Sequence, residues 1–285
     1  MNILIKSTGF IGDILFSTSV ARQMKREDRT LLIDYQIPLN APYEILQLDN
    51  NINRIFLPNE EVDESSYDKV FTLPHCTQEE PPTIQYQKHC GVKDLDPSYD
   101  VKVPHSSIEV ISNMMRPHKE QGKKIVAWQG NWEEKSFGYT EEEYKRGVDV
   151  PNLGYGGRRR DINFLVSELS KRYLLIKVGF DPGVTQNQIG LLTTGIYTHT
   201  AAILSQCDYM IGGESGLINL AAGVGTKTII TGDYVHQLYG WNGVIRKLKE
   251  PKLGPEFYFE SGHVSLNPYL TDKEVVEQII NIIGN

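Results

Sequence analysis

Strand-like apolar segments alternate with helix-like segments in two successive series along the chain of 285 residues. The first series opens with the Ile- and Leu-rich segment 2–8, followed by a helical pattern from Ile11 to Met24. The second opens with the strand-like segment 124–128 and closes with a predicted helix at 272–283. Alternation of this kind predicts parallel sheets covered by helices. The repetition of the series predicts an α/β chain with two Rossmann-like domains that face each other across a cleft.

The two series are separated by a less regular stretch, residues 75–120, which is punctuated by prolines. Proline, charge and glycine cluster at its end, around 115–122, as they do at domain boundaries. We therefore predict domains at residues 1–118 and 119–285. A later stretch, 129–160, is polar and rich in Gly and Tyr, and connections of that length are usually functional or mobile.

The net charge limits the kinds of partner that the chain could bind, and the cysteine content indicates its cellular compartment. With 29 basic and 36 acidic residues the net charge is −7, which argues against a general binder of nucleic acid or anionic membranes. Two basic clusters, 158–160 and 246–249, are either local binding sites or solvated loops. The cysteines, Cys76, Cys90 and Cys207, have no metal-ligand spacing, which predicts reduced thiols and a cytoplasmic location. No apolar run approaches the ~20 residues that span a bilayer, so we predict a soluble protein.

The first candidate site is the turn Gly9-Phe10-Ile11-Gly12-Asp13, between the first predicted strand and helix. Ligands of open α/β sheets bind at the carboxyl ends of strands, and glycines there allow a close approach. Asp13 falls in the first helical turn, where the helix dipole favours a carboxylate. The side chain is either a general base that takes a proton from a hydroxyl or a simple cap of the helix. The spacing differs from the dinucleotide fingerprint.

The second candidate site is the segment 212–223, in which a short buried strand leads into a Gly- and Ser-rich turn and a helix of small residues. The free backbone N–H groups at such a helix start bind anions, and Ser215 could add a hydroxyl donor. The alternative is a tight turn that binds nothing. Because the turn falls at the carboxyl edge of a sheet, we favour an anion site, with phosphate as the natural ligand.

Lys135 is a third candidate, because it follows the first strand of the second series and could neutralise a phosphate as a point charge. Taken alone, an ordinary surface lysine is the simpler interpretation. No metal site is predicted, since the histidines are scattered without zinc-type spacing. The sequence also lacks a metal-holding Asp-x-Asp motif, a Walker loop and a GxSxG turn. We therefore expect no metal and no cofactor.

Taken together, several segments resemble the ADP-heptose:lipopolysaccharide heptosyltransferase family, whose members have the GT-B fold. These segments are 3–18 with its Gly-Asp pair, 49–55, 202–212, 214–222 and 226–233. Segment 49–55 is similar to the family's Asn-Pro-x-Val-Asp-Arg-Val pattern. Segment 214–222 is similar to its Asp-Ser/Thr-Gly-x-x-His-Leu-Ala-Ala turn. The matches fall in two blocks that have the expected order and separation.

The resemblance implies a role for most of the candidate residues. Asp13 matches the catalytic base of the family. Ser215, Gly216 and the backbone that follows match the diphosphate site, and Gly12 is expected among the donor contacts. Lys135 falls where the family has a phosphate-binding lysine.

Two positions depart from the family pattern. Glu214 matches an Asp that touches the donor sugar and is longer by one methylene. Asn219 stands where the family has His, and we expect it among the donor contacts. Arg158 or Arg160 could replace Lys135 as the phosphate partner, or could contact the acceptor.

These matches imply a glycosyltransferase that moves a hexose or heptose from a nucleotide-diphosphate sugar to a hydroxyl of a glycan or other acceptor. An inverting, metal-independent displacement is expected. The helix at 271–283 is expected to pack back on the first domain, as in this fold. One alternative is a transferase whose acceptor is a modified nucleic-acid base, which the basic clusters motivate. Another is a non-catalytic nucleotide-sugar-binding protein, and the position of Asp13 favours the enzyme over it.

Overall fold

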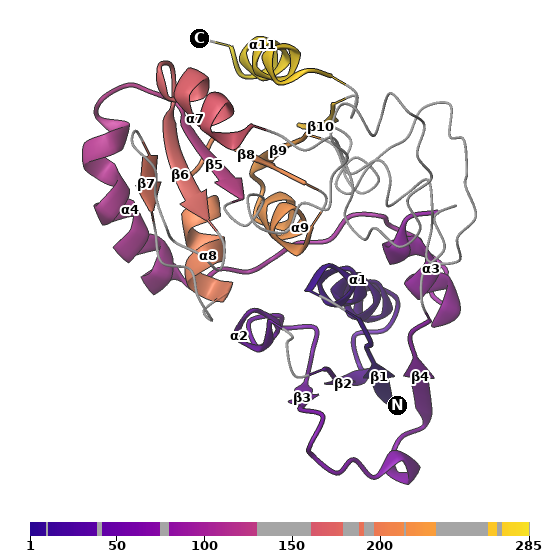
Figure 1. Ribbon diagram of the computed structural model, residues 1–285. Coiled ribbons are helices and arrows are strands. Elements are labelled where there is room, and N and C mark those ends of the chain that lie inside the picture. Colours follow the sequence, from indigo (N-terminus) through magenta and orange to yellow (C-terminus); the bar gives the residue numbers. More distant parts are fainter. Residues whose placement is uncertain are drawn as a thin grey trace.

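The computed structural model describes residues 1–9, 11–38, 42–74, 80–129, 161–178, 188–190, 197–213, 215–231, 262–266 and 270–284. These residues form two parallel β-sheets with helices packed on them (Figure 1). The α/β class predicted from the alternating segments is therefore confirmed. Within the described part of the chain, no helix has the length and apolarity that crossing a membrane requires.

The first sheet has four parallel strands in the order β3-β2-β1-β4. Its central strand β1 is a run of apolar side chains, and Ile3, Leu4 and Ile5 are all buried, as expected for a strand covered on both faces. The strands are β1 (Asn2–Lys6), β2 (Leu32–Gln36), β3 (Arg54–Phe56) and β4 (Lys69–Thr72).

The long helix α1 (Ile11–Glu27) follows β1 and lies between the first sheet and helix α9 (Gly216–Gly223) (Figure 1). Its middle is buried although it contains Ser17, Thr18 and Ser19. Each of these hydroxyls donates to the carbonyl three residues earlier, at 2.7 Å, so that no hydroxyl is buried without a partner. This part of the chain also contains α2 (Tyr43–Leu46), which contacts α8, a 3-10 turn η1 (Glu64–Ser66), and α3 (Pro82–His89), which packs against α1.

The second sheet has six parallel strands in the order β10-β9-β8-β5-β6-β7. Its strands are β5 (Ile125–Gln129), β6 (Leu174–Val178), β7 (Gln188–Gly190), β8 (Tyr209–Gly212), β9 (Lys227–Ile230) and β10 (His263–Ser265). Its helices, besides α9, are α4 (His105–Lys119), α7 (Ile162–Ser170), α8 (Tyr197–Leu204) and α11 (Asp272–Ile283).

The side chains of β5 alternate between two apolar cores. On one face, α7 and α11 pack with Val126 and Trp128. On the other face, α8 and α9 pack with Ile125 and Ala127, and this core continues into α1 and the first sheet. The period of two along a strand explains the division. The two sheets are consequently joined through the α1–α9 contact by one continuous core.

Two helices pack in places that the sequence did not predict. Helix α4 lies in the stretch 75–120 and packs against α8, although most of it precedes the boundary expected at residue 118. Helix α11 places its apolar stripe, which includes Val275 and Ile279, in the core beside α7. This packing differs from the expectation that the helix at 271–283 returns to the first domain.

Candidate functional site

The N-termini of α1 and α9 meet at the carboxyl edges of the two sheets. A Cβ added to Gly216 would lie 2.9 Å from Ile11 Cβ and 3.6 Å from the backbone nitrogen of Gly12. A Cβ added to Gly12 would lie 3.2 Å from Asn219 Nδ2. Glycine at 216 is thus a requirement of close helix contact. Because the first N–H groups of a helix have no partner within the helix, two sets of donors converge here.

Asp13 lies in the first turn of α1 and is half-buried. Its carboxylate lies against the backbone of Gly9, where a Cβ would be 2.5 Å from Oδ2. Gly9 has φ +118°, a backbone conformation that residues other than glycine rarely adopt. From α3, the buried hydroxyl of Tyr86 donates to Asp13 Oδ1 at 3.4 Å. The carboxylate is therefore held at the start of α1 by a glycine turn and a tyrosine.

Ser215 is the N-cap of α9, and its Oγ accepts from the backbone N–H of Ile218 at 3.4 Å. The same hydroxyl donates to Gln129 Oε1 at 2.8 Å. Gln129 ends β5 and was not singled out from the sequence, although a polar residue that ends an apolar strand is a recognisable signal. Because the Ser215 hydroxyl donates its proton to Gln129, the groups left to donate hydrogen bonds to an anion at this turn are the backbone N–H groups.

Asn219, expected among the donor contacts, is 2% exposed and faces α1. Its backbone carbonyl accepts from the hydroxyl of Tyr99 at 2.7 Å. The structure therefore brings Gly12, Gly216 and Asn219 together at the contact between two helices. Contact of Asn219 with a donor stays a prediction.

Lys177 in β6 is a buried cation that the sequence analysis missed. It is 3% exposed, and its Nζ lies 5.6 Å from the centroid of the Trp128 ring on the neighbouring strand. Within the described residues, no carboxylate forms an ion pair with it. Buried charges are usually paired, so an anion near this carboxyl edge would be stabilised. The signal in the sequence is a single lysine inside the apolar run Leu174–Val178.

Trp128 also lines an apolar pocket beside the Ser215 turn. The pocket lies between the carboxyl ends of the strands and helices α7 and α11, and Gln129, Gly212 and Thr231 form its strand side. Leu165 and other apolar side chains of the two helices complete it. The accessible lining of this pocket is apolar.

Four of the predicted site residues, Lys135, Arg158, Arg160 and Glu214, lie outside the described residues. Among the residues that are described, no three His, Cys, Asp or Glu side chains are grouped as metal ligands would be. Two cysteines, Cys90 and Cys207, are free and buried. Burial raises the pKa of both thiols to about 12, so neither is a nucleophile at neutral pH.

The two sheets and their connections define a class of α/β fold that solved glycosyltransferase structures share. A glycosyltransferase family 9 structure from Veillonella parvula DSM 2008 matches with a TM-score of 0.63 at 10% identity, over 99% of this chain and 97% of that chain. E. coli ADP-heptose lps heptosyltransferase II matches with a TM-score of 0.57 at 13% identity, over 99% and 98% of the two chains.

E. coli heptosyltransferase WaaC, solved with ADP, matches with a TM-score of 0.56 at 11% identity, over 99% of this chain and 97% of that chain. No family model matches the sequence, and no curated protein matches it. This chain therefore shares an α/β fold of parallel sheets with solved glycosyltransferase structures, at sequence identities that show the fold alone.

Proposed function

We propose that the chain is a glycosyltransferase of the GT-B type, which transfers a sugar from a nucleotide-diphosphate sugar to an acceptor hydroxyl. The observation that carries the proposal is the meeting of two helix N-termini, one bearing Asp13 and the other the Ser215–Gly216 turn. In the proposal Asp13 is the carboxylate base and the start of α9 is the anion site, and the nearness of the two helix starts supports both roles. In this proposal residues 1–118 bind the acceptor and residues 119–285 bind the donor.

On the donor side, the diphosphate would accept hydrogen bonds from the N–H groups at the start of α9. Negative charge on the departing diphosphate would be stabilised by the helix N-terminus and by a cation. Lys135, Arg158 and Arg160 are candidates from the sequence, and Lys177 is a further candidate from its burial at this edge.

On the acceptor side, Asp13 would accept the proton of the attacking hydroxyl. The acceptor oxygen then forms a bond to the anomeric carbon while the bond from that carbon to the diphosphate oxygen breaks. The nucleoside diphosphate leaves with the bonding electron pair, and the anomeric configuration is inverted by the single displacement. The charge is carried by protein groups throughout, so that a metal-independent reaction is proposed.

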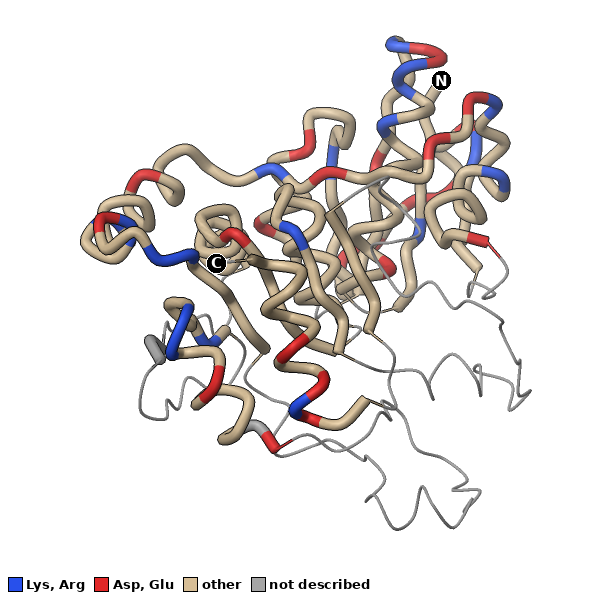
Figure 2. Tube along the Cα trace, turned by 90° about the horizontal axis from the view of Figure 1, so that it is seen from above, with Lys and Arg blue, Asp and Glu red and all other residues tan. Residues whose placement is uncertain are grey.

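The similarity to heptosyltransferase structures, one of them solved with ADP, supports a hexosyl or heptosyl donor. Glu214 and Asn219 depart from the family pattern at the sugar and phosphate contacts, so the proposal extends to nucleotide sugars other than ADP-heptose. A glycan hydroxyl is the proposed acceptor. Basic and acidic residues are interspersed along the described chain (Figure 2), which favours a glycan over a nucleic acid. A cytoplasmic location stays a prediction from the cysteines.

A screen of nucleotide sugars by thermal shift tests the donor first, because a ligand that binds only the folded state raises its stability in proportion to affinity. With the best donor, release of the nucleoside diphosphate is then measured for the wild type and for Asp13→Asn. Removal of a general base should lower kcat by about 10²–10⁴-fold, with donor affinity retained. A matched surface variant, Asp94→Asn, should behave as wild type. Turnover of Asp13→Asn near the wild-type rate would remove Asp13 from the mechanism.

A further inference from the structure

We propose that Tyr99 is a positioning residue, which holds the start of α9 in place against the start of α1. Tyr99 lies in the segment 96–102, here called the crossing segment, which leads from α3 to α4. The inference rests on the proposed function, because the start of α9 is the proposed diphosphate site and the start of α1 carries Asp13. The separation of these two parts must be fixed if a sugar is to pass between their ligands.

Tyr99 touches both helices at once. Its hydroxyl donates to the carbonyl of Asn219, in the first turns of α9, at 2.7 Å. Its ring packs edge-on against Phe16 of α1, with 5.3 Å between the ring centroids. Tyr99 is 2% exposed. One rigid, fully buried side chain therefore connects α1 to α9, on the same turn of α9 whose Asn219 side chain faces Gly12.

The backbone of the crossing segment adds a second connection, at the far end of α9. The N–H of Val101 donates to the carbonyl of Gly223 at 2.8 Å. A Cβ added to Gly223 would lie 2.5 Å from Val101 Cγ2 and 3.0 Å from Tyr99 Cε2. The segment thus packs directly on the backbone of α9, which is connected both near its start and at its last residue.

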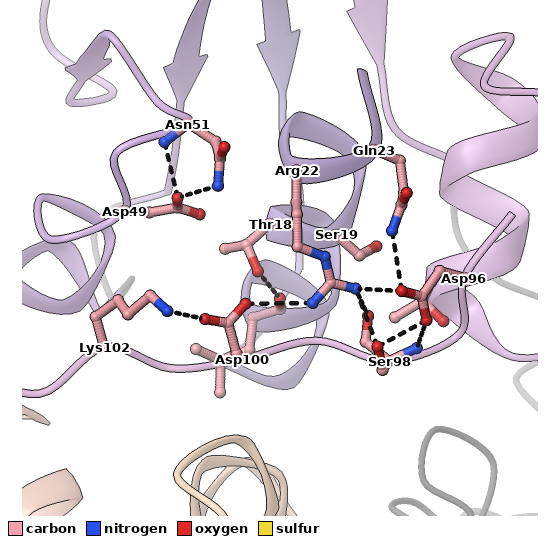
Figure 3. A network of polar contacts seen from close by, with 12 residues as sticks. Thr18, Ser19, Arg22, Gln23, Asp49, Asn51, Asp96, Ser98, Asp100 and Lys102 are labelled. Atoms are coloured by element: carbon pink, nitrogen blue, oxygen red, sulfur yellow. Dashed lines mark hydrogen bonds and ion pairs between the residues drawn. The ribbon is translucent and has the colours of Figure 1, made fainter. Parts of the chain in front are cut away.

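The other side of the crossing segment is fastened to α1 by Arg22 (Figure 3). The guanidinium of Arg22 forms ion pairs with Asp96 at 3.3 Å and with Asp100 at 3.2 Å, and it donates to the carbonyl of Ser98. Gln23 of α1 donates to Asp96 as well, at 3.1 Å. Because the Arg22 side chain is only 15% exposed, these contacts are screened less than surface ion pairs.

The arrangement has a mechanical consequence for the site. Arg22 fixes the crossing segment on α1. Through its hydrogen bond to Asn219, Tyr99 then holds the first turns of α9 at a set distance from α1. Without the Tyr99 hydroxyl, α9 could shift along or around its axis relative to α1. The Ser215–Gly216 turn would then move relative to Asp13, and a displacement of about 1 Å between reacting groups is enough to slow an enzyme by about 10²-fold.

The experiment compares Tyr99→Phe with a matched control, Tyr35→Phe. Tyr35 is also fully buried, and its hydroxyl also donates to a helix carbonyl at 2.7 Å, that of Ser17 in α1. Both variants keep the ring and lose one hydroxyl. Two quantities are measured for each: hydrogen–deuterium exchange of the backbone amides of α9, and steady-state kcat and donor KM for release of the nucleoside diphosphate.

Both variants should show similar, small falls in melting temperature. Tyr99→Phe alone should exchange faster in α9 and should lose about tenfold or more in kcat, with a smaller change in donor KM. Equal exchange in α9 for wild type and Tyr99→Phe would overturn the inference, and so would equal kinetic losses in the two variants. If wild type transfers no sugar, the proposed function fails, while the exchange measurement still decides whether Tyr99 holds α9.

Discussion

Gly216 lies directly against Ile11, so that a Cβ at position 216 would be 2.9 Å from the Cβ of Ile11. The first residue of α9 therefore touches the first residue of α1. One helix follows a strand of the first sheet and the other follows a strand of the second. The two helices meet at their N-termini, where the helix dipoles are positive. The contact has no room for any side chain at position 216. One substitution of this glycine therefore tests both the packing of the two helices and the binding of an anion between them.

Replacement of Gly216 by Ala should force the starts of α1 and α9 apart. Overpacking of a buried contact costs about 1–3 kcal/mol, so the free energy of unfolding in urea should fall by that amount. Binding of nucleoside diphosphate, followed by calorimetry, should weaken because the N–H groups of the two helices no longer converge. Stability equal to that of wild type would show that the helices separate freely and that the contact does not shape the site.

Removal of the Ser215 hydroxyl by Ser215→Ala should cost about 1 kcal/mol of stability, because the N-cap of α9 and the hydrogen bond to Gln129 are both lost. Thr271 caps α11 with a full capping box and lies away from the site, so Thr271→Ala should cost a similar amount. Only Ser215→Ala should weaken nucleoside diphosphate binding, by about fivefold to tenfold, because the lost cap and the lost bond to Gln129 no longer hold the turn whose backbone N–H groups bind the anion. Equal calorimetric affinities for both variants would exclude Ser215 from the anion site.

Much of this fold follows from local pattern in the sequence. The apolar runs that form β1 and β6, the Asp161 cap of α7 and the capped helix α11 all lie where periodicity and capping predict them. Helix α4 was not predicted, because Pro104 and Pro117 suggest a break in regular structure. Pro104 instead stands at the N-cap, at the start of the helix, where proline is tolerated. Pro117 lies inside the last turn, where it removes one helical hydrogen bond without ending the helix before Lys119.

The site is harder to predict because its contacts join residues far apart in the sequence. Gly12 and Ser215 can each be recognised from a strand–glycine–helix pattern, but no local signal shows that the two helix starts touch. The same holds for Tyr99, whose partner Asn219 is 120 residues away. Gln129 and Lys177 carry weak signals, since each is a single polar residue in an apolar strand. Their importance depends on which strands are neighbours.

Acid should weaken the attachment of the crossing segment to α1. Burial acts to raise the pKa of Asp96, but hydrogen bonds from Ser98 and the charge of Arg22 outweigh it, and the pKa lies below its ordinary value of 3.8. The pKa of Asp100 is lowered in the same way: burial is outweighed by Lys102 and Arg22. A carboxyl whose pKa is lower in the folded state stabilises the fold above its unfolded pKa, and this contribution is lost as the pH falls through the folded pKa.

The free energy of unfolding in urea should therefore decline as the pH falls below about 4. Burial raises the pKa of Asp49, so that this carboxyl acts in the opposite sense and makes the decline shallower. Asp96→Asn should lower stability at pH 7 and flatten the decline in acid. Asp94→Asn, two residues earlier and exposed, should follow the wild-type curve. Parallel acid profiles for wild type and Asp96→Asn would show that the Asp96 carboxylate contributes nothing to the attachment.

Replacement of Lys177 by Met should distinguish an anion-binding lysine from one that only packs on Trp128. Met keeps most of the apolar stem and removes the buried charge, so the stability of the unliganded protein should stay equal or rise, as for other buried charges exchanged for apolar groups. Affinity for nucleoside diphosphate should fall by about tenfold, and its dependence on salt should become weaker. Lys171→Met is the matched control, because Lys171 is an exposed residue at the C-cap of α7 and is paired with Glu168. An affinity unchanged from wild type, together with a loss of stability, would assign Lys177 to packing and leave the diphosphate to Lys135 or the arginines at 158 and 160.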